Sequence, residues 1–354
     1  MKTAAIICEY NPFHNGHLYH LKETRAMLGE DTNIICLMSG NFVQRGEPAF
    51  QDKWKRAETA ARNGADLVLE LPFSYACNGA EQFATGAVKI LNKLGIVDYL
   101  SFASETGNIE DLEKAVAEDE NRLRSMLDKG LSYPKAMQES TGADESVLKS
   151  PNNTLGVEYL RALKKTKSSI KPVTMMRKGN ISSSAIRLAY SRGDDISGFV
   201  PETCDGYTGG IPYNLVASTV LSMSAEELDS LPSAGEGIGN RLKSEIRKYD
   251  DTKNFVEAVR QSRYTRARIN RCICQALVGY EESDCIRVLA VGRHGGLIVR
   301  RLEADGIEVV TNINKRQGVS ERDIIATDIY NLITGRDLYK ESDFVRRPYV
   351  SSSI

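Results

Sequence analysis

The sequence predicts an α/β protein in which a doubly wound parallel sheet is followed by a second, mainly helical α+β domain. Three observations support this prediction. From residue 3 to about 105, short apolar segments alternate with segments of helical periodicity. The apolar segments are hydrophobic nearly throughout, which is typical of strands that have helices on both faces. Beyond a stretch rich in Gly, Asp and Pro at residues 191–214, helical segments dominate.

The apolar segments of the first domain have the length of strands, and the segments between them have the length of helices. The predicted strands are residues 3–8, 33–40, 66–72, 98–104 and 171–176. The predicted helices are residues 53–65, 79–95, 109–130 and 153–165, with another beginning near residue 181. This alternation predicts parallel strands with crossover helices on both faces of the sheet.

A change of character near residue 200 divides the chain. We assign residues 1–195 to the first domain, 196–215 to a linker and 216–354 to the second domain. In the second domain we predict helices at 224–232, 239–250, 254–262, 266–280 and 321–335, and strands at 285–292 and 295–311. We expect residues 346–354 to be unstructured or to lie along the surface.

The composition is that of an ordinary globular protein and excludes several classes. The formal charge of −1 over 354 residues argues against a surface that coats a polyanion. Seven cysteines without a CxxC pair indicate neither a disulfide framework nor a zinc ribbon. There is no signal-peptide pattern and no run of 18 apolar residues. We therefore expect a soluble, cytoplasmic protein without a membrane partner, and its oligomeric state stays open.

Three of the four histidines lie within one short segment, EYNPFHNGHLYHL at residues 9–21. Pro12 ends the first strand, Asn15 and Gly16 form a turn, and a helix begins near His17. The carboxyl end of a first strand borders the ligand crevice of a doubly wound sheet, and a helix N-terminus there attracts anions. We expect N–H donors on His14 and His17 to bind phosphate and to stabilise charge on departing pyrophosphate.

Two other interpretations of this segment stay open. His14, His17 and His20 are spaced three residues apart, so they could be zinc ligands, although Pro12 and the Asn-Gly turn place His14 outside the helix. They could also be ordinary surface histidines. His20 lies one turn beyond His17 and is as plausible in a structural role as in catalysis.

HNGH is a variant of the HxGH motif of the nucleotidyltransferase superfamily, which includes the class I aminoacyl-tRNA synthetases. Further motifs follow in order along the chain: MSGNFVQRGEPA, KWKRAETAARNGADLVLELP, FASE, SPNNTLGVEYLRALK, ISSSAIR, GEGIGNRL and SRYTRARINR. Together they resemble the tRNA(Met) cytidine acetate ligase family from about residue 3 to the last helix. The resemblance implies a Rossmann-like HxGH nucleotidyltransferase domain followed by a tRNA-binding domain.

The resemblance also implies an activity. Such an enzyme uses ATP as a co-substrate, expected together with Mg²⁺, to convert acetate to acetyl-adenylate and pyrophosphate. It then acetylates N4 of the wobble cytidine of elongator tRNA(Met), giving N4-acetylcytidine. A cytosine amino group is a poor nucleophile because its lone pair is delocalised into the ring, so a mixed anhydride is needed. Acetate and elongator tRNA(Met) are the implied partners.

The resemblance and the residue chemistry together give a set of site residues. His14, His17 and Arg187 are the expected catalytic residues. The expected ATP ligands are Ile7, Cys8, Glu9, Tyr10, Asn11, Pro12, Phe13, His14, Asn15, Gly16, His17, Leu18, Tyr19, His20, Ala103, Asn152, Arg177, Ser182 and Ser183. The hydroxyls, N–H groups and guanidinium of the serine-rich helix start suit the β- and γ-phosphates, although a plain capping run would look the same. We expect no protein-bound metal, and either Asn152 or Asn153 could instead cap its helix.

Other polar residues of the first domain allow two interpretations each. Asn41 and the loop residues Gln44, Arg45 and Gly46 could close on phosphate or acetate, or form a surface turn. Lys53, Lys55 and Arg56 are expected on a solvated helix face. Glu70 lies in an apolar strand, so it must either face the crevice or pair with a cation, Arg45 or Arg56 being the candidates.

A basic segment in the second domain is the expected tRNA contact. Residues 241–271 hold ten Lys or Arg and four Asp or Glu, an excess of six positive charges. Arg241, Arg263, Arg268 and Arg271 are the predicted tRNA-binding residues, with Tyr264 as a stacking ring. A solvated helix face is the alternative.

Two other functions are compatible with the first-domain motifs. One is an adenylyltransferase that makes a dinucleotide-type cofactor, which would share HxGH and ISSSAIR but would need no basic second domain. The other is a nucleotide-regulated RNA-binding protein, which would bind ATP without forming pyrophosphate.

Overall fold

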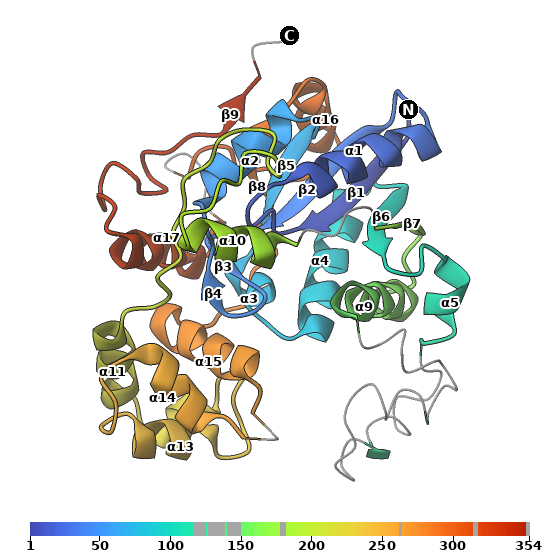
Figure 1. Ribbon diagram of the computed structural model, residues 1–354. Helices are drawn as coiled ribbons and strands as arrows, with labels where there is room; N and C mark the ends of the chain where they lie inside the picture. The colour runs from blue at the N-terminus through green and yellow to red at the C-terminus, as the bar shows by residue number, and fades with distance from the viewer. Residues whose placement is uncertain are drawn as a thin grey trace.

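A mainly parallel sheet organises the chain. The computed structural model describes residues 1–116, 125–126, 139, 150–177, 182–261, 264–313 and 318–351. Over these residues the main sheet has seven strands in the order β7-β6-β1-β2-β5-β8-β9 (Figure 1). The predicted doubly wound α/β fold is confirmed.

Five strands of the main sheet match the predicted ones and run parallel. They are β1 (Thr3–Cys8), β2 (Asn33–Ser39), β5 (Leu67–Leu71), β6 (Tyr99–Ser104) and β7 (Lys171–Met176). The register places Thr3 of β1 opposite Asn33 of β2, and Ile35 of β2 opposite Leu67 of β5. The strand order reverses beside β1, so the carboxyl ends of β1 and β6 diverge around a crevice.

Helices cover both faces of the sheet because neighbouring strand residues point to opposite faces. On one face, Ala5, Ile35 and Leu69 pack against α4 (Ala80–Leu94), α9 (Pro151–Lys165) and α16 (Gly295–Ala304). On the other face, Ile6 and Ile34 pack against α1 (Asn15–Leu28) and α2 (Lys53–Arg62). The strands are therefore hydrophobic at nearly every position.

A third core lies in the helical unit, which we define as α11–α15 together with α17. Its helices are α11 (Tyr213–Ser222), α12 (Ala225–Asp229), α13 (Ile238–Glu245), α14 (Thr252–Val259), α15 (Arg266–Val278) and α17 (Glu321–Thr334). Phe42 and Val43 of the first domain also belong to this core. They lie in the hairpin of β3 (Phe42–Val43) and β4 (Glu47–Pro48). The hairpin thus joins the helical unit to the sheet.

The predicted second domain differs from the structure, since residues 216–354 do not form one separate unit. β8 (Arg287–Val291) pairs antiparallel with β5, and β9 (Tyr349–Val350) pairs parallel with β8. An apolar strand satisfies its backbone groups by pairing with an open sheet edge, and β5 provides that edge. Of the two alternatives expected for residues 346–354, unstructured or lying along the surface, the pairing of β9 excludes the first at Tyr349–Val350.

One predicted strand is a helix in the structure, and one predicted helix is described only at its start. Residues 295–311 were expected to be a strand, but α16 forms from Gly295 to Ala304 because Ile298 and Leu302, one turn apart, are both buried on the sheet. The predicted helix at 109–130 is represented by α5 (Ile109–Glu113), and much of the remainder lies outside the described residues. α3 (Phe73–Ala76) and α10 (Ser183–Ser191) complete the first domain.

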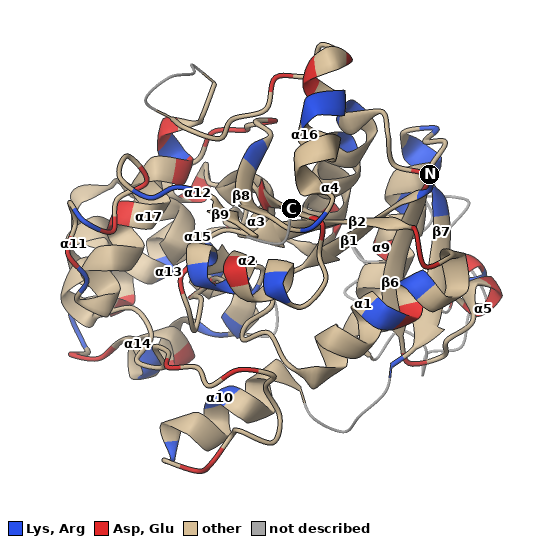
Figure 2. Ribbon diagram, turned by 90° about the horizontal axis from the view of Figure 1, so that it is seen from above, with Lys and Arg blue, Asp and Glu red and all other residues tan. Residues whose placement is uncertain are grey.

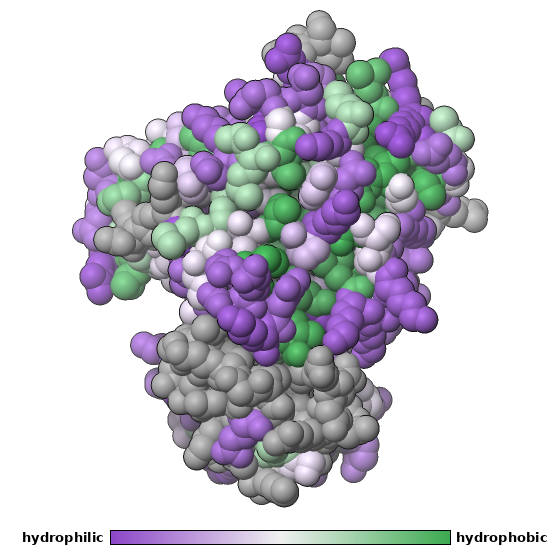
Figure 3. Space-filling view, turned by 90° about the vertical axis from the view of Figure 1, so that its right-hand side faces the viewer, coloured by the Kyte–Doolittle hydropathy of each residue, from purple (hydrophilic) through white to green (hydrophobic). Residues whose placement is uncertain are grey.

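The surface is mixed in character. Viewed from the side that carries β7, α5 and α9, apolar side chains lie among hydrophilic ones (Figure 3). Within the described part of the chain, every helix is too short or too polar to cross a bilayer.

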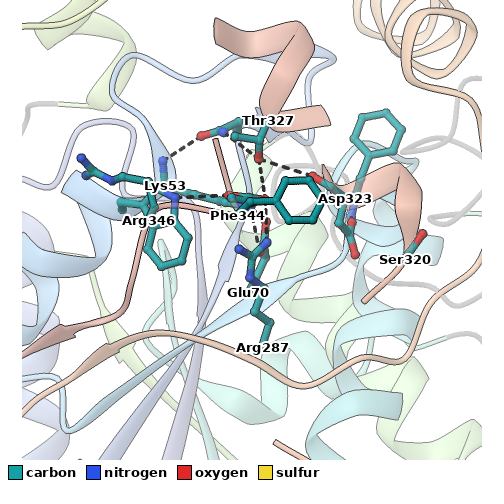
Figure 4. A network of polar contacts seen from close by, with 12 residues as sticks. Lys53, Glu70, Arg287, Ser320, Asp323, Thr327, Phe344 and Arg346 are labelled. Atoms are coloured by element: carbon teal, nitrogen blue, oxygen red, sulfur yellow. Dashed lines mark hydrogen bonds and ion pairs between the residues drawn. The ribbon is translucent and has the colours of Figure 1, made fainter. Parts of the chain in front are cut away.

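A network of buried charges lies between α2, β5, β8 and the segment after α17 (Figure 4). We call Lys53, Glu70, Arg287 and Asp343 the buried charge network. Lys53 Nζ lies 2.7 and 2.9 Å from the Glu70 carboxylate oxygens and 2.9 Å from Asp343 Oδ2. Arg287 Nη1 lies 2.6 Å from Asp343 Oδ2 and 3.3 Å from Glu70 Oε2. Glu70 is therefore a structural residue, and its partners are not the predicted Arg45 or Arg56.

The predicted solvated face of α2 is wrong for two of its three cations. Lys53 and Arg56 are both 0% exposed, whereas Lys55 is half-exposed beside Glu58. The Arg56 guanidinium donates to the backbone carbonyls of Glu9, Ser39 and Gly40 at the ends of β1 and β2, and to that of Gln51 just before α2. Arg56 thus holds together the two strand ends that border the crevice.

Asn41 is also structural rather than ligand-binding. Its side chain is 3% exposed. Asn41 Oδ1 accepts the backbone N–H of Lys53 at 2.8 Å, and Asn41 Nδ2 donates to Thr327 Oγ1 at 3.3 Å. The residue therefore ties the hairpin loop to α2 and α17.

Candidate active site

An open cavity of about 810 Å³ lies at the carboxyl ends of β1, β6 and β7. The HNGH segment forms one wall. The start of α10 forms another, and the β3–β4 hairpin closes the side next to β2. This is the crevice that the strand order predicts, because ligands bind where the order of a doubly wound sheet reverses.

The HNGH segment is arranged by local contacts. The backbone of Tyr10 has φ of 48°, which turns the chain away from β1. His14 is the N-cap of α1, and its Nδ1 accepts the backbone N–H of Gly16 at 3.0 Å. The backbone N–H of His14 in turn donates to His17 Nδ1 at 3.2 Å. The two imidazole rings are stacked, with centroids 3.8 Å apart.

These hydrogen bonds assign the tautomers of both rings. Each Nδ1 accepts a backbone N–H, so each neutral ring carries its proton on Nε2. Burial lowers the pKa of His14 to about 4, with a smaller contribution from Arg177. Burial also lowers the pKa of His17, helped by His14, His20 and Arg177. At neutral pH the cavity therefore presents two uncharged imidazoles as Nε2–H donors at a helix N-terminus.

The same geometry argues against the zinc interpretation. A zinc ligand must offer a nitrogen lone pair, but in His14 and His17 those lone pairs already accept backbone N–H groups. Among the described residues, no group of three or more His, Cys, Asp and Glu side chains could hold a metal ion.

His20 is held by the core of the sheet. Its Nε2 lies 3.0 Å from Ser101 Oγ on β6, and Thr24 Oγ1 lies 2.9 Å from the same hydroxyl. Burial lowers the pKa of His20 to about 4. This contact favours the structural role over the catalytic one, although His20 is also among the residues that line the cavity.

The low pKa of His20 predicts a loss of stability in mild acid. Between the ordinary pKa of 6.5 and the folded value of about 4, the unfolded chain binds a proton here that the folded protein does not. The free energy of unfolding therefore falls as pH falls, and His20 contributes about 2 kcal/mol of this loss between about pH 7.5 and pH 5. His20→Gln keeps a donor for Ser101 without titrating. Urea unfolding of this variant at several pH values should show a shallower pH dependence, and an unchanged slope would contradict the assignment.

Two arginines flank the histidines. Arg187, on α10, donates from Nη1 to the backbone oxygen of Asn11 at 2.6 Å, and its Nη2 lies 3.9 Å from Glu47. Burial lowers the pKa of its guanidinium. Arg177 follows β7, and its Nη1 lies 4.0 Å from Glu105. The cavity thus combines two cations with the two imidazole donors, a set that suits a polyphosphate.

The starts of α9 and α10 are capped by serines. Ser150 is the N-cap of α9, so the predicted cap at Asn152 or Asn153 is wrong. Asn152 Nδ2 instead donates to Glu105 Oε1 at 2.7 Å, and Asn153 Oδ1 accepts the backbone N–H of Glu105 at 2.9 Å. Ser182 caps α10 through the N–H of Ala185.

Most of the predicted ATP-site and catalytic residues line this one cavity. They are Ile7, Cys8, Glu9, Tyr10, Asn11, His14, Gly16, His17, Tyr19, His20, Ala103, Asn152, Arg177, Ser182, Ser183 and Arg187. Four others, Pro12, Phe13, Asn15 and Leu18, are not among the lining residues. Asn15 faces the predicted linker, because its Nδ2 donates to the Gly198 carbonyl at 3.1 Å. Phe13 is buried against the Tyr10 ring.

Several lining residues were not predicted. Glu47, Phe83 and Tyr159 line the cavity, and so do Gln44 and Arg45, whose role was left open. Phe83 and Tyr159 lie on the buried faces of α4 and α9, where an aromatic residue looks the same as any core residue. The strand order of the folded sheet brings α4 and α9 beside β1, so their place at the cavity could not be read from the local pattern.

The predicted tRNA-binding arginines mostly brace the helical unit. Arg241 donates to the Ala258 carbonyl at 2.7 Å. Arg268 donates to the carbonyls of Ser233 and Ala234 at 3.0 and 2.7 Å. Arg263 lies outside the described residues. Tyr264, the predicted stacking ring, is 5% exposed and donates to the Glu236 carbonyl.

Arg271 connects the helical unit to the cavity. Its Nη1 donates to the Gln44 carbonyl of the hairpin at 3.2 Å. Next to it, Gly46 has φ of 71°, and a Cβ there would lie 2.3 Å from the backbone nitrogen of Arg271. Only glycine allows the hairpin to approach α15 this closely.

Other cations of the basic segment are exposed. They are Arg247, Lys248, Lys253, Arg260 and Arg266. In Figure 2, Lys and Arg positions are interspersed with Asp and Glu positions along the ribbon. A polyanion would therefore meet local groups of cations and not a uniformly positive face.

Comparison with known proteins agrees with this geometry. Residues 1–343 match the family model described as HIGH Nucleotidyl Transferase. The tRNA(Met) cytidine acetate ligase of Acetivibrio thermocellus is 36% identical, over 93% of this chain and 94% of that protein. The tRNA(Met) cytidine acetate ligase of Clostridium novyi is 34% identical, over 98% of this chain and 99% of that protein.

A solved structure is similar over almost the whole chain. It is the crystal structure of Thermotoga maritima TmcAL bound with alpha-thio ATP, which superposes with a TM-score of 0.87 and 28% identity over 99% of this chain and 100% of that one. Its fold and the full-length sequence matches lead to one assignment. This chain belongs to the tRNA(Met) cytidine acetate ligase family of HIGH nucleotidyltransferases.

Proposed function

We propose that this protein uses ATP to activate acetate as acetyl-adenylate and transfers the acetyl group to N4 of the wobble cytidine of elongator tRNA(Met). The observation that carries the proposal is the pair of neutral imidazoles, His14 and His17, at the N-terminus of α1 inside the cavity. Membership in the family and the alpha-thio ATP in the Thermotoga maritima relative support it.

The first step joins acetate to AMP. An acetate oxygen attacks the α-phosphorus of ATP, and pyrophosphate leaves with the electron pair of the broken P–O bond. The Nε2–H groups of His14 and His17 would donate to the phosphate oxygens, and Arg177 and Arg187 would neutralise the departing charge. No covalent enzyme intermediate is needed. The contribution of the enzyme is positioning and electrostatic stabilisation.

The Mg²⁺ that we propose to accompany ATP would be held largely by phosphate oxygens and water. This agrees with the donor set, because no group of three or more His, Cys, Asp and Glu side chains among the described residues could hold a metal ion. When bound, the ion would offset phosphate charge.

The second step needs the tRNA. We propose that its phosphates contact exposed cations of the helical unit, such as Arg247, Lys253 and Arg260, and not the buried sides of Arg268 and Arg271. The contact between Arg271 and the hairpin would set the distance from the helical unit to the cavity. Because tRNA acts in the cytoplasm, the proposal also implies a cytoplasmic enzyme.

The test follows labelled acetate. Incubated with ATP and total tRNA, the protein should transfer the label to elongator tRNA(Met), where nuclease digestion and mass spectrometry should find N4-acetylcytidine at the wobble position. Reactions without ATP, and with a transcript carrying uridine at that position, should stay unlabelled. Release of a stable adenylylated metabolite without tRNA would instead support the adenylyltransferase alternative. ATP binding without pyrophosphate formation would support the RNA-binding alternative.

A further inference from the structure

The cavity extends to both sides of β1. On the side of β6 and β7 it is lined by Ala103, Asn152 and Arg177, the residues expected to contact ATP. On the side of β2 it is lined by Gln44 and Arg45 of the hairpin. Glu9 follows the last residue of β1 directly and therefore lies between the two sides.

Glu9 is fixed in place but keeps one oxygen for the cavity. Its Oε1 accepts the backbone N–H of Gln44 at 2.8 Å, and its own carbonyl accepts from Arg56. Among the described residues, no hydrogen-bond partner is present for Oε2, and the side chain lines the cavity. A fixed carboxylate with a free acceptor oxygen can bind an N–H donor that enters from the β2 side.

The surroundings tune this carboxylate as a base. Burial raises the pKa of Glu9, while the Gln44 N–H and the nearby cations Arg56, Arg187 and Arg45 act in the opposite direction. The Tyr159 phenol lies close enough that Glu9 helps to raise its pKa. A carboxyl with a raised pKa takes up a proton more readily than an ordinary one, which is what a general base requires.

The histidines and the other carboxylate that line the cavity are less suited to this role. His14 and His17 use Nδ1 as an acceptor and carry a proton on Nε2, so neither offers a lone pair. His20 Nε2 contacts Ser101, and its ring is held by the core. Glu47 lies 3.9 Å from Arg187 at the outer edge, on a half-exposed side chain.

We propose that Glu9 accepts a hydrogen bond from the N4 amino group of the cytidine and takes its proton during acetyl transfer. The inference rests on the proposed function and adds a catalytic residue to its second step. It also explains a preference for cytidine, because a carboxylate accepts from the cytosine amino group but repels the O4 carbonyl of uracil.

The N4 lone pair attacks the carbonyl carbon of acetyl-adenylate, and an N4–C bond forms. The bond between that carbon and the phosphate oxygen breaks, and AMP leaves with its electron pair. The N4 proton passes to the Glu9 carboxylate, which later releases it to water. The products are N4-acetylcytidine and AMP.

Glu9→Gln separates the two half-reactions. Glutamine keeps an oxygen that can accept the Gln44 N–H, but it cannot take up a proton. Acetate-dependent exchange of labelled pyrophosphate into ATP measures whatever Glu9 contributes to ATP binding, and its loss should be much smaller than the loss of acetyl transfer. Single-turnover transfer from acetyl-adenylate to saturating tRNA should fall about a hundredfold, the usual contribution of a general base.

The pH profile identifies the base. Only the ionised carboxylate accepts the proton, so wild-type transfer should slow as pH falls through the raised pKa of Glu9. The variant should lose this dependence, and Glu9→Asp should restore it in part. Glu58→Gln, which removes a partly buried carboxylate from α2 outside the cavity, serves as the control for charge and should behave as wild type in both assays.

Two results would overturn the assignment. One is wild-type transfer by Glu9→Gln. The other is an equal loss of exchange and transfer, which would make Glu9 a residue that positions the hairpin or the nucleotide. A failure of the proposed function is distinguishable, because the wild-type protein itself would then show no acetate-dependent exchange or no transfer to tRNA.

Discussion

Replacing His17 with alanine is expected to lower acetate-dependent ATP–pyrophosphate exchange by about 10² to 10³-fold, the usual effect of removing one preorganised donor. The neutral ring donates from Nε2, since its Nδ1 accepts the backbone N–H of His14. His17 lines the cavity, where under the proposed function charge would develop on the phosphate oxygens. Its loss should lower kcat more than it raises KM for ATP, because the contact strengthens in the transition state.

Two further substitutions separate the donor from the helix cap. His17→Asn can still accept the N–H of His14 but has no group at the Nε2 position, so it should be as inactive as the alanine variant and fold normally. His17→Gln offers a donor near the Nε2 position without the cap, and it should recover part of the activity. His294→Ala, which changes the one histidine outside residues 9–21, is the matched control. Undiminished exchange by His17→Asn would contradict the role of Nε2–H.

Lys53→Met is expected to lower the free energy of unfolding by about 3 to 5 kcal/mol, as found when one partner of a buried ion pair is removed. Lys53 Nζ lies within 2.9 Å of oxygens from both Glu70 and Asp343, and its side chain is fully buried. Methionine has a similar length but leaves the two carboxylates with Arg287 as their remaining cation in the network. Urea unfolding at neutral pH measures the difference.

The control for this change lies two residues away. Lys55 is on the same helix, its side chain is 41% exposed, and its partner Glu58 lies at 3.5 Å. Lys55→Met should change the free energy of unfolding by less than about 0.5 kcal/mol. Gly40, which precedes the hairpin, packs against the buried charge network, since a Cβ there would lie only 2.7 Å from Glu70 Oε1. The hairpin therefore rests on this network, and Lys53→Met should also reduce activity. Equal stability of the two variants would show that the network contributes little.

The site could be predicted from the sequence where neighbouring residues determine it. Pro12, the Asn-Gly turn and the two histidines lie within six residues, and their contacts are made inside that segment. The order of strands and helices was also predictable, since the apolar segments are buried on both faces. The sequence therefore predicts the HNGH segment at the crevice, and in the structure this segment forms one wall of the cavity.

Charges and distant strands could not be predicted in the same way. Lys53 and Arg56 look like the solvated face of a helix, but Lys53 pairs with residues 17 and 290 positions away. The position of β8 beside β5 and the contact of Arg271 with the hairpin likewise join segments far apart in the chain. Local periodicity contains no information about such partners.

The sequence by itself determined the parallel α/β fold, the position of the HNGH corner that we propose to bind phosphate, and the family, because each depends on short-range patterns. Only the tertiary structure decided the tautomers of those histidines, the burial of Lys53 and the position of Glu9 between the two sides of the cavity. The physical reason is that the energy of a charged or polar group is set by the atoms around it, and folding brings those atoms from segments distant in sequence.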